Sequence, residues 1–391
     1  MSKESRKDWP RVKFGDVVRL SKARCADPLA EGIERFVGLE HLEPGDLRIQ
    51  NWGSVADGIT FTSVFKPGQV LFGKRRAYQR KVAVAEFTGV CSGDIYVLES
   101  LDANILLPDL LPFICQTDAF FEHAVGTSAG SLSPRTNWSS LSGFEFALPS
   151  NKEQKGLLYA CQVFEESVRA YESAFMAAIG YNDSLRESIF DICSSEIRLS
   201  DVLSDIQAGK SLVGIDEPST EPDQKAVLKV SAVGKLAFLP TESKILIKQE
   251  EFLNEHSVRE GDVLISRANT PELVGLVCHV NHDHQNLMLS DKTLRLVPKE
   301  GVPSLLLVES LRTKAARQYL KANATGTGGA MKNISQAKLR DMPIRFPTQE
   351  QWDGLVPIVK AAVISIENIA NRFSNAKAFQ RRATQQMFVG E

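Results

Sequence analysis

The 391-residue sequence lacks any long apolar segment and any strong excess of charge of one sign. Its longest apolar runs, such as residues 105–107 and 305–308, are far shorter than the ~20 residues that cross a bilayer. The first residues are charged and contain no apolar segment typical of a signal peptide, so the sequence predicts a cytoplasmic protein. Hydrophobic residues make up 43% and charged residues 24%, which excludes a disordered or collagen-like chain.

Cysteine is scarce and scattered along the chain. None of the six cysteines forms a C-x-x-C pair, which disfavours a disulfide framework or a structural zinc site and predicts buried, unpaired thiols. Three histidines, His279, His282 and His284, follow Cys278 in a polar turn. Because this H-x-x-H-x-H pattern has no matching second pair, we predict no metal site.

Motifs for catalysis are also missing. Residues 204–211 resemble the end of a Walker A loop, but Ser204 stands where the pattern needs glycine, so a loop after a strand is the favoured interpretation. The sequence has no N/D-P-P-Y/F segment and no glycine fingerprint for S-adenosylmethionine. We therefore predict that the chain is neither a methyltransferase nor another enzyme. A nucleotide hydrolase using Gly209, Lys210 and Ser211 is the enzymatic alternative.

An internal repeat is the strongest feature that is present. Ser150 with Glu153, and Thr348 with Gln351, are capping boxes 198 positions apart (150 and 348), and each follows a proline and opens a long helical pattern. Two helices of about 40 residues, or about 60 Å, are predicted. Pro357 should kink the second helix or end its first turn.

Each helical pattern carries a heptad seam of apolar residues. Neither helix can bury its seam alone, so we predict that the two pair with each other, antiparallel because the repeat implies a pseudo-twofold axis. The predicted seam residues are Leu157, Phe164, Val168, Tyr171, Phe175, Leu185 and Ile189 in the first helix and Leu355, Val359, Ile366, Ile369, Phe373 and Met387 in the second.

The segments before the helices repeat more loosely. Short apolar runs at residues 70–72, 95–98, 263–265 and 293–297 predict strands, and residues 106–121 and 304–322 predict helices. The predicted organisation is a domain at residues 1–149, a spacer helix at 150–193, a second domain at 194–347 and a C-terminal spacer helix at 348–391. The fold class is α+β: two mixed α/β domains joined by two long antiparallel coiled-coil helices in a pseudo-twofold repeat.

The order of these motifs resembles a known family. It runs from W-P-x-V-x-F-G-D-V through F-x-P-G-x-V-L-F-G-K-R-R and two glycine-rich segments to L-P or F-P with E-Q opening each long helix. In both halves this order resembles the specificity subunit of type I restriction–modification enzymes. The resemblance implies a non-catalytic subunit whose two target-recognition domains each bind one half of a split double-stranded DNA site. It also implies two DNA-adenine methyltransferase subunits docked on the helices, possible restriction or translocase subunits, no cofactor on this chain, and S-adenosylmethionine on the methyltransferase.

Local basic segments are where a chain of net charge −2 could bind DNA. Residues 66–81 hold six basic residues, a tyrosine and no acid, and further polar residues follow the glycine-rich turns. Arginine can bind guanine edges, and both basic residue types neutralise phosphates. The candidate DNA-binding residues are Lys74, Arg75, Arg76, Tyr78, Arg80, Lys81, Arg135 and Asn137 in the first half and Arg267, Asn269, Lys332 and Asn333 in the second.

A different class of function fits the same helices. In a non-DNA adaptor, the coiled coil would be the functional part and the two domains would bind proteins. The salt dependence of DNA binding separates the two hypotheses, because phosphate contacts lower the affinity log-linearly with salt.

Overall fold

The structure is a computed structural model that describes residues 9–192, 195–219, 221, 223–328 and 331–388. The chain forms two compact units: unit 1 consists of residues 1–173 and 371–391, and unit 2 of residues 174–370. Cys193 lies outside the described residues, as do Gly329 and Ala330 of the glycine-rich segment at residues 326–330. None of the described helices is both long enough and apolar enough to cross a membrane.

Unit 1 contains two four-stranded sheets and a two-stranded one. Their strands, in sheet order, are β2 (Val18–Leu20), β9 (Ile95–Ser100), β6 (Val70–Gly73) and β7 (Val82–Val84); β4 (Gly53–Ser54), β3 (Arg35–Val37), β8 (Gly89–Cys91) and β5 (Ser63–Phe65); and β1 (Arg11–Lys13) with β10 (Glu145–Ala147). The short helices are α2 (Phe14–Val17), η1 (Leu39–His41), η2 (Val55–Asp57), η3 (Ala77–Gln79), η4 (Pro108–Leu110), α3 (Leu111–Cys115), α4 (Asp118–Gly126) and α5 (Trp138–Leu141).

Unit 2 repeats this plan. Its sheets are β12 (Leu203–Ala208), β21 (Thr293–Pro298), β17 (Val263–Ser266) and β19 (Val277–His279); β13 (Gly214–Ile215), β15 (Ser243–Leu246), β14 (Ala226–Leu228), β20 (His284–Met288) and β16 (Ser257–Val258); β18 (Ala268–Asn269), β23 (Met331–Asn333) and β22 (Thr325–Gly328); and β11 (Glu196–Arg198) with β24 (Pro343–Arg345). Its short helices are α7 (Leu199–Val202), η5 (Val230–Ala232), η6 (Gln249–Glu251), η7 (Asn254–His256), α8 (Ser304–Arg312), α9 (Lys314–Asn323) and α10 (Gln336–Arg340). The four predicted strands are confirmed.

The helices predicted at residues 106–121 and 304–322 are confirmed, but each range is divided into more than one helix. Residues 106–121 form η4, α3 and α4, and residues 304–322 fall within α8 and α9. The break lies at a threonine in each unit. The hydroxyl oxygen of Thr117 accepts the backbone N–H of Phe120, and that of Thr313 accepts the N–H of Ala316, so each threonine caps a new helix.

The core of unit 1 is rich in phenylalanine. Phe14 and Phe120 pack with their ring centroids 5.1 Å apart, and Phe72 packs edge-on against Phe120 at 5.4 Å. All three side chains are fully buried. The cysteines behave as predicted where they are described, since Cys25, Cys91, Cys115, Cys161 and Cys278 are free and buried.

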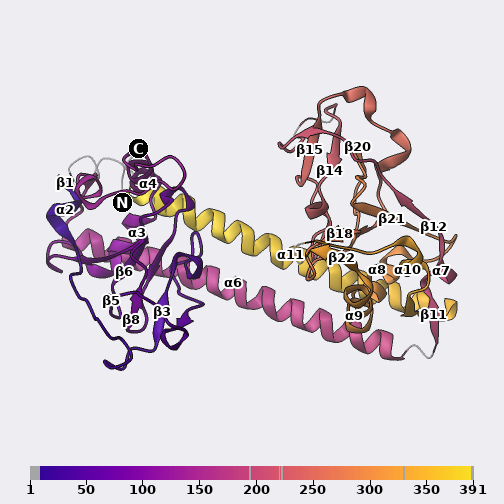
Figure 1. The fold of residues 1–391 in the computed structure, drawn as a ribbon, viewed down its shortest axis with the longest axis horizontal. Helices are drawn as coiled ribbons and strands as arrows, with labels where there is room; N and C mark the ends of the chain where they lie inside the picture. The colour runs from indigo at the N-terminus through magenta and orange to yellow at the C-terminus, as the bar shows by residue number, and fades with distance from the viewer. Residues whose placement is uncertain (1–8, 193–194, 220, 222, 329–330, 389–391) are drawn as a thin grey trace. The chain divides into compact units, whose positions relative to one another are not determined.

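Two long helices complete both units: α6 (Asn151–Ile192) and α11 (Gln349–Phe388). They lie side by side within each unit (Figure 1). Both capping boxes are confirmed, because the backbone N–H of Ser150 donates to Glu153 at 3.0 Å and that of Thr348 to Gln351 at 2.9 Å. Helix α11 runs unbroken through Pro357, so the prediction that this proline could end the first turn was wrong.

The contacts of each unit show that α6 and α11 are antiparallel. In unit 1, the Phe164 ring packs edge-on against Phe379 at 5.4 Å, and Gln380 donates to Glu165 at 2.6 Å. In unit 2, Ile189 near the end of α6 is buried in one cluster with Val359 near the start of α11. The predicted antiparallel pairing is confirmed.

Seam residues differ in how deeply they are buried. Leu157, Val168, Ile189, Val359 and Ile366 are buried. Tyr171 is 39% exposed. The remaining predicted seam residues are half-buried: Phe164, Phe175, Leu185, Leu355, Ile369, Phe373 and Met387.

Candidate nucleic-acid interface

The basic segment of unit 1 forms a tight loop after strand β6. Its centre is the single turn η3, and both flanking residues have a left-handed backbone, with φ of 54° at Arg76 and 56° at Arg80. Residues other than glycine rarely adopt this backbone conformation. Where they do, the residue often lies in a functional loop. The backbone of the loop is therefore held in a conformation that its contacts with the rest of unit 1 must stabilise.

This loop pairs with the glycine-rich segment that follows α4. Arg75 forms a β-bridge with Arg135, which in turn bridges to Ala129. The N–H of Arg76 donates to the carbonyl of Pro134 at 2.7 Å, and the N–H of Thr136 donates to the carbonyl of Lys74 at 3.0 Å. Two predicted candidate segments, about 60 residues apart, therefore become one surface.

An acidic residue that the sequence analysis missed lies between two of these arginines. Asp94 accepts from Arg75 at 3.1 Å and pairs with Arg135 at 2.9 Å. The carboxylate neutralises part of the local positive charge and fixes both guanidinium groups. Its place in the loop before β9 was visible in the sequence, but its partners were not.

Several predicted DNA-binding residues are engaged within the protein. The ammonium of Lys74 lies 4.4 Å from the centroid of the Tyr96 ring, and burial lowers the pKa of Lys74 despite the nearby Asp94. Lys81 donates to the carbonyl of Leu39 at 2.7 Å. Asn137 caps helix α5 by accepting the N–H of Ser140 at 2.8 Å.

Arg80 also has protein partners. Its Nη2 donates to the carbonyl of Gln116 at 3.2 Å and to Asp118 at 2.5 Å. The guanidinium lies 4.5 Å from the centroid of the Phe121 ring. Arg80 therefore anchors the loop to helix α4.

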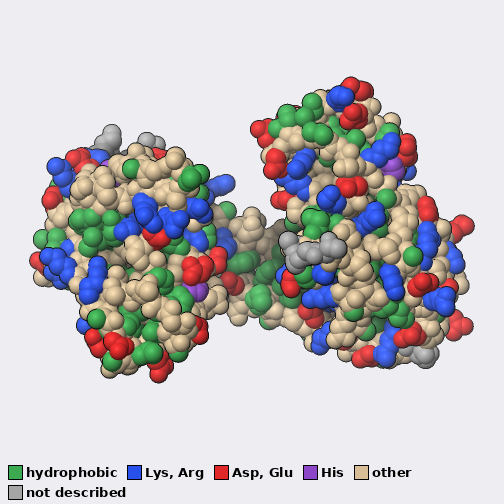
Figure 2. Space-filling model, in the orientation of Figure 1, with side chains coloured by type: hydrophobic (Ala, Val, Ile, Leu, Met, Phe, Trp, Pro, Cys, Tyr) green, Lys and Arg blue, Asp and Glu red, His purple; other side chains and the backbone are tan. Residues whose placement is uncertain are grey.

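Three predicted residues remain accessible on this loop platform. Arg76 is exposed, the Tyr78 side chain is 55% exposed, and the Arg135 side chain is 54% exposed. Figure 2 shows that basic and acidic side chains are interspersed over the visible face of each unit. The candidate interface is therefore a local group of arginines and an aromatic ring.

Unit 2 builds an equivalent platform from the sheet β18-β23-β22. Asn269 pairs with Lys332, Ala268 pairs with Asn333, and β23 pairs in turn with β22. The exposed Asn333 lies 198 positions after Arg135 (135 and 333), within the same three-part arrangement. The two platforms share a backbone plan and differ in side chains.

The other candidate DNA-binding residues of unit 2 already form some of their hydrogen bonds within the protein. Asn269 Oδ1 accepts the N–H of Thr270 at 2.9 Å, and Lys332 Nζ lies 3.4 Å from the carbonyl of Gly326. The Nε of Arg267 is buried and has no hydrogen-bond partner among the described residues. Arg317, another basic residue of unit 2, donates to the carbonyls of Gly275 and Glu272, and burial lowers its pKa.

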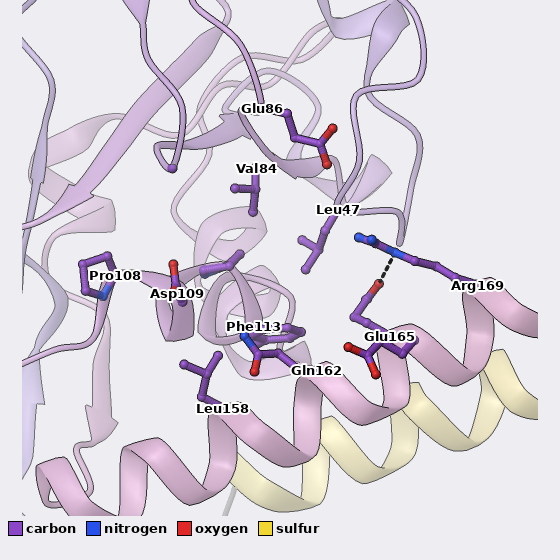
Figure 3. A pocket seen from close by; sticks show the side chains of 13 residues that line it. Leu47, Val84, Glu86, Pro108, Asp109, Phe113, Leu158, Gln162, Glu165 and Arg169 are labelled. Atoms are coloured by element: carbon purple, nitrogen blue, oxygen red, sulfur yellow. Dashed lines mark ion pairs between the residues drawn. The ribbon is translucent and has the colours of Figure 1, made fainter.

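A cavity of about 330 Å³ in unit 1 has more acidic than basic side chains in its lining, in contrast to the basic loop platform (Figure 3). Its apolar wall includes Leu47 and Val84, which precede α6 in the chain, and Leu158 of α6. Glu86, Asp109, Glu165 and Glu166 also line the cavity, with Arg169 3.9 Å from Glu165. Four carboxylates to one arginine disfavour DNA phosphate at this place.

The other motifs have structural explanations. Gly209 packs against the backbone of Leu289 so closely that a Cβ atom would overlap the Leu289 carbonyl. The two ring nitrogens of His279 contact Asn281 and Ser304, at 2.9 and 3.0 Å. Among the described residues, no three His, Cys, Asp or Glu side chains are grouped so as to hold a metal ion.

Comparisons with known proteins point to one class. No family model matches the chain. The chain is 31% identical to the specificity subunit of the type I restriction enzyme EcoEI from Escherichia coli over 151 residues, which are 38% of this chain and 25% of that protein. It is 23% identical to the EcoKI specificity subunit of Escherichia coli K12 over 208 residues, 52% of this chain and 42% of that protein. The chain thus spans less than half the length of these curated relatives in the matched regions.

Two solved structures share the fold. One is a chain from a structural study of complex assembly and conformational transition of the type I R-M system, with 18% identity and a TM-score of 0.54. The other is the S subunit of a type I restriction–modification system from M. genitalium, with 12% identity and a TM-score of 0.54. Each likeness covers 97% of this chain and 96% of the other.

The fold therefore defines a protein of two units that repeat one α+β plan and share paired long helices. In sequence, parts of the chain are similar to specificity subunits of type I restriction enzymes, and its fold is similar to that of an S subunit, in agreement with the resemblance of its motifs.

Proposed function

We propose that the chain is the DNA-specificity subunit of a type I restriction–modification complex. One recognition domain in each unit would bind one half of a bipartite target. The observation that carries the proposal is the duplicated loop platform, in which Arg75, Arg135 and Ala129 correspond to strands β18, β23 and β22. Platforms that share a backbone but differ in side chains suit two related sites of different sequence.

The proposed subunit has no chemistry of its own. Methyl transfer, and the S-adenosylmethionine that it consumes, would belong to partner methyltransferase subunits. The chain would supply sequence recognition and a scaffold for assembly.

The first test addresses the platform of unit 1. We expect Arg76→Gln to weaken binding of mixed-sequence duplex DNA and to lower the slope of log K against log salt by about one. Arg76 is exposed, so the loss should come from one phosphate contact rather than from unfolding. Fluorescence anisotropy over a salt series measures both quantities.

The control for that test is Lys66→Gln. Lys66 is an exposed cation of the same basic segment, but it lies before strand β6, whereas η3 follows that strand. The Lys66→Gln substitution should leave the slope of log K against log salt near that of the parent protein. If Arg76, Lys74, Arg75 and Arg80 can all be replaced without change in affinity or slope, the assignment of this loop to DNA is wrong.

The second test addresses the partners. Tyr181 and Phe379 lie 198 positions apart (181 and 379) in α6 and α11, and they are 70% and 61% exposed. Exposed aromatic residues at equivalent positions of a repeat suit two copies of one partner, because aromatic side chains commonly dominate interface energies. We propose that each helps to dock one methyltransferase subunit.

Light scattering on co-purified complexes measures the stoichiometry. We expect two methyltransferase copies per parent chain, one copy for Tyr181→Ala or Phe379→Ala, and none for the double variant. Tyr159→Ala is the control, since Tyr159 is 71% exposed on α6 but its counterpart 198 positions on is Pro357. A parent complex with a single copy would refute the twofold docking.

A further inference from the structure

A second cavity of unit 1, of about 260 Å³, lies between the recognition domain and the last part of α11. Among the described residues that line it, three are cationic, namely Arg80, Lys377 and Arg381, and none carries a carboxylate. This lining contrasts with the acidic cavity of Figure 3. The positive charge of these three side chains therefore favours an anionic ligand.

The cationic side chains are held in place before any ligand binds. Asp118, the first residue of α4, accepts from Arg80 at 2.5 Å and from Arg381 at 3.1 Å. Gln385 of α11 accepts the backbone N–H of Asp118 at 2.8 Å. These bonds connect α11 to the loop platform and fix one edge of each guanidinium.

Several hydrogen-bond donors that line this cavity remain available to bind an anion. In the described part of the chain, both hydrogen bonds of the Arg80 guanidinium use Nη2, so Nε and Nη1 still have protons to donate. The Nε2 of Gln116 is buried and has no partner among the described residues. Lys377 is exposed, with its Nζ 5.1 Å from the centroid of the Phe373 ring.

The position of the cavity indicates which anion binds. Arg80 ends the turn η3, which also presents the exposed Arg76 and Tyr78. A phosphate in the cavity would thus be continuous with the candidate interface. We propose that this cavity binds one backbone phosphate of the DNA, through Lys377 and Arg381 of α11 together with Arg80.

This inference rests on the proposed function and extends it to the long helix. Helix α11 would then contact DNA directly, in addition to pairing with α6 and docking a partner. Lys377 and Arg381 would add affinity without sequence preference, because phosphate contacts position the protein but do not specify bases.

The test uses the full chain and a mixed-sequence 40-base-pair duplex. Lys377→Gln and Arg381→Gln should each lower the salt slope by about one and the affinity by about eightfold at 0.1 M salt, since log K changes by about 0.9 per phosphate contact for each decade of salt. Both side chains are exposed, so folding should be kept. The control is Arg372→Gln, nine residues from Arg381 and so on the opposite face of α11 at 3.6 residues per turn.

A reciprocal variant excludes simple damage. Asp118→Asn removes the carboxylate that competes for Arg80 and Arg381, so we expect DNA affinity to rise about threefold at low salt. If both α11 variants match Arg372→Gln while the parent chain shows salt-dependent binding, the cavity is no phosphate site and the proposed function stands. Loss of methyltransferase binding with an unchanged DNA slope would also overturn the inference. A parent chain without salt-dependent binding would instead refute the proposed function.

Discussion

Replacing Glu309 by alanine is expected to lower the free energy of unfolding of unit 2 by about 3–5 kcal/mol. Glu309 lies on α8, is 2% exposed, and accepts from Arg186 of α6 at 2.6 Å and from Arg312 at 2.9 Å. Arg186 is itself buried, and although burial opposes its charge, Glu309 and Asp183 keep its pKa raised. Without the carboxylate, a buried guanidinium loses its main counter-charge. The midpoint of urea unfolding, followed by circular dichroism, measures the loss.

A matched exposed pair supplies the control. Arg345 and Asp191, also in unit 2, form an ion pair at 2.5 Å with side chains 51% and 69% exposed. Asp191→Asn should cost at most about 1 kcal/mol, because solvent screens such pairs. The double variant Arg186→Met with Glu309→Leu should recover only part of the loss, because apolar groups replace the Arg186–Glu309 pair but Arg312, whose side chain is 13% exposed, still loses its carboxylate partner. Equal losses for Glu309→Ala and Asp191→Asn would show that burial does not set the cost.

Shortening both long helices by one heptad is expected to shorten the unread gap of the DNA target by about three base pairs. Each residue of an α-helix adds 1.5 Å, so seven residues remove about 10 Å. Helices α6 and α11 each contain residues of both units without a break, so under the proposed function the deletion would shorten the connection between the two recognition domains. Deleting residues 168–174 together with 366–372 removes equivalent positions and keeps both seams in phase.

Methylation mapping of that variant, assembled with its methyltransferase, measures the gap and both half-sites. The half-sites should be unchanged, because the deletion does not touch either loop platform. A single deletion in α6 alone is the control, and it should impair folding because the two seams no longer match. An unchanged gap, or altered half-sites with the old spacing, would show that the helices do not set the distance.

Local and periodic features were accessible from the sequence. The capping boxes at Ser150 and Thr348, the heptad seams and the duplicated strands all depend on neighbours in the chain or on a fixed repeat, so they predicted α6, α11 and the shared plan. The breaks at Thr117 and Thr313 also had a local signal, a capping threonine in an apolar run, which the prediction of helices at residues 106–121 and 304–322 did not use.

What the sequence by itself determined is the duplicated architecture and the regions that carry positive charge. Only the tertiary structure decided which of those charges are accessible, because Asp94 and Asp118 reach their arginine partners through contacts distant in sequence. Tertiary packing also brought Lys377 and Arg381 to the same cavity as Arg80, about 300 residues away along the chain. Electrostatic pairing depends on distance in space, and no periodic pattern in the sequence encodes that distance.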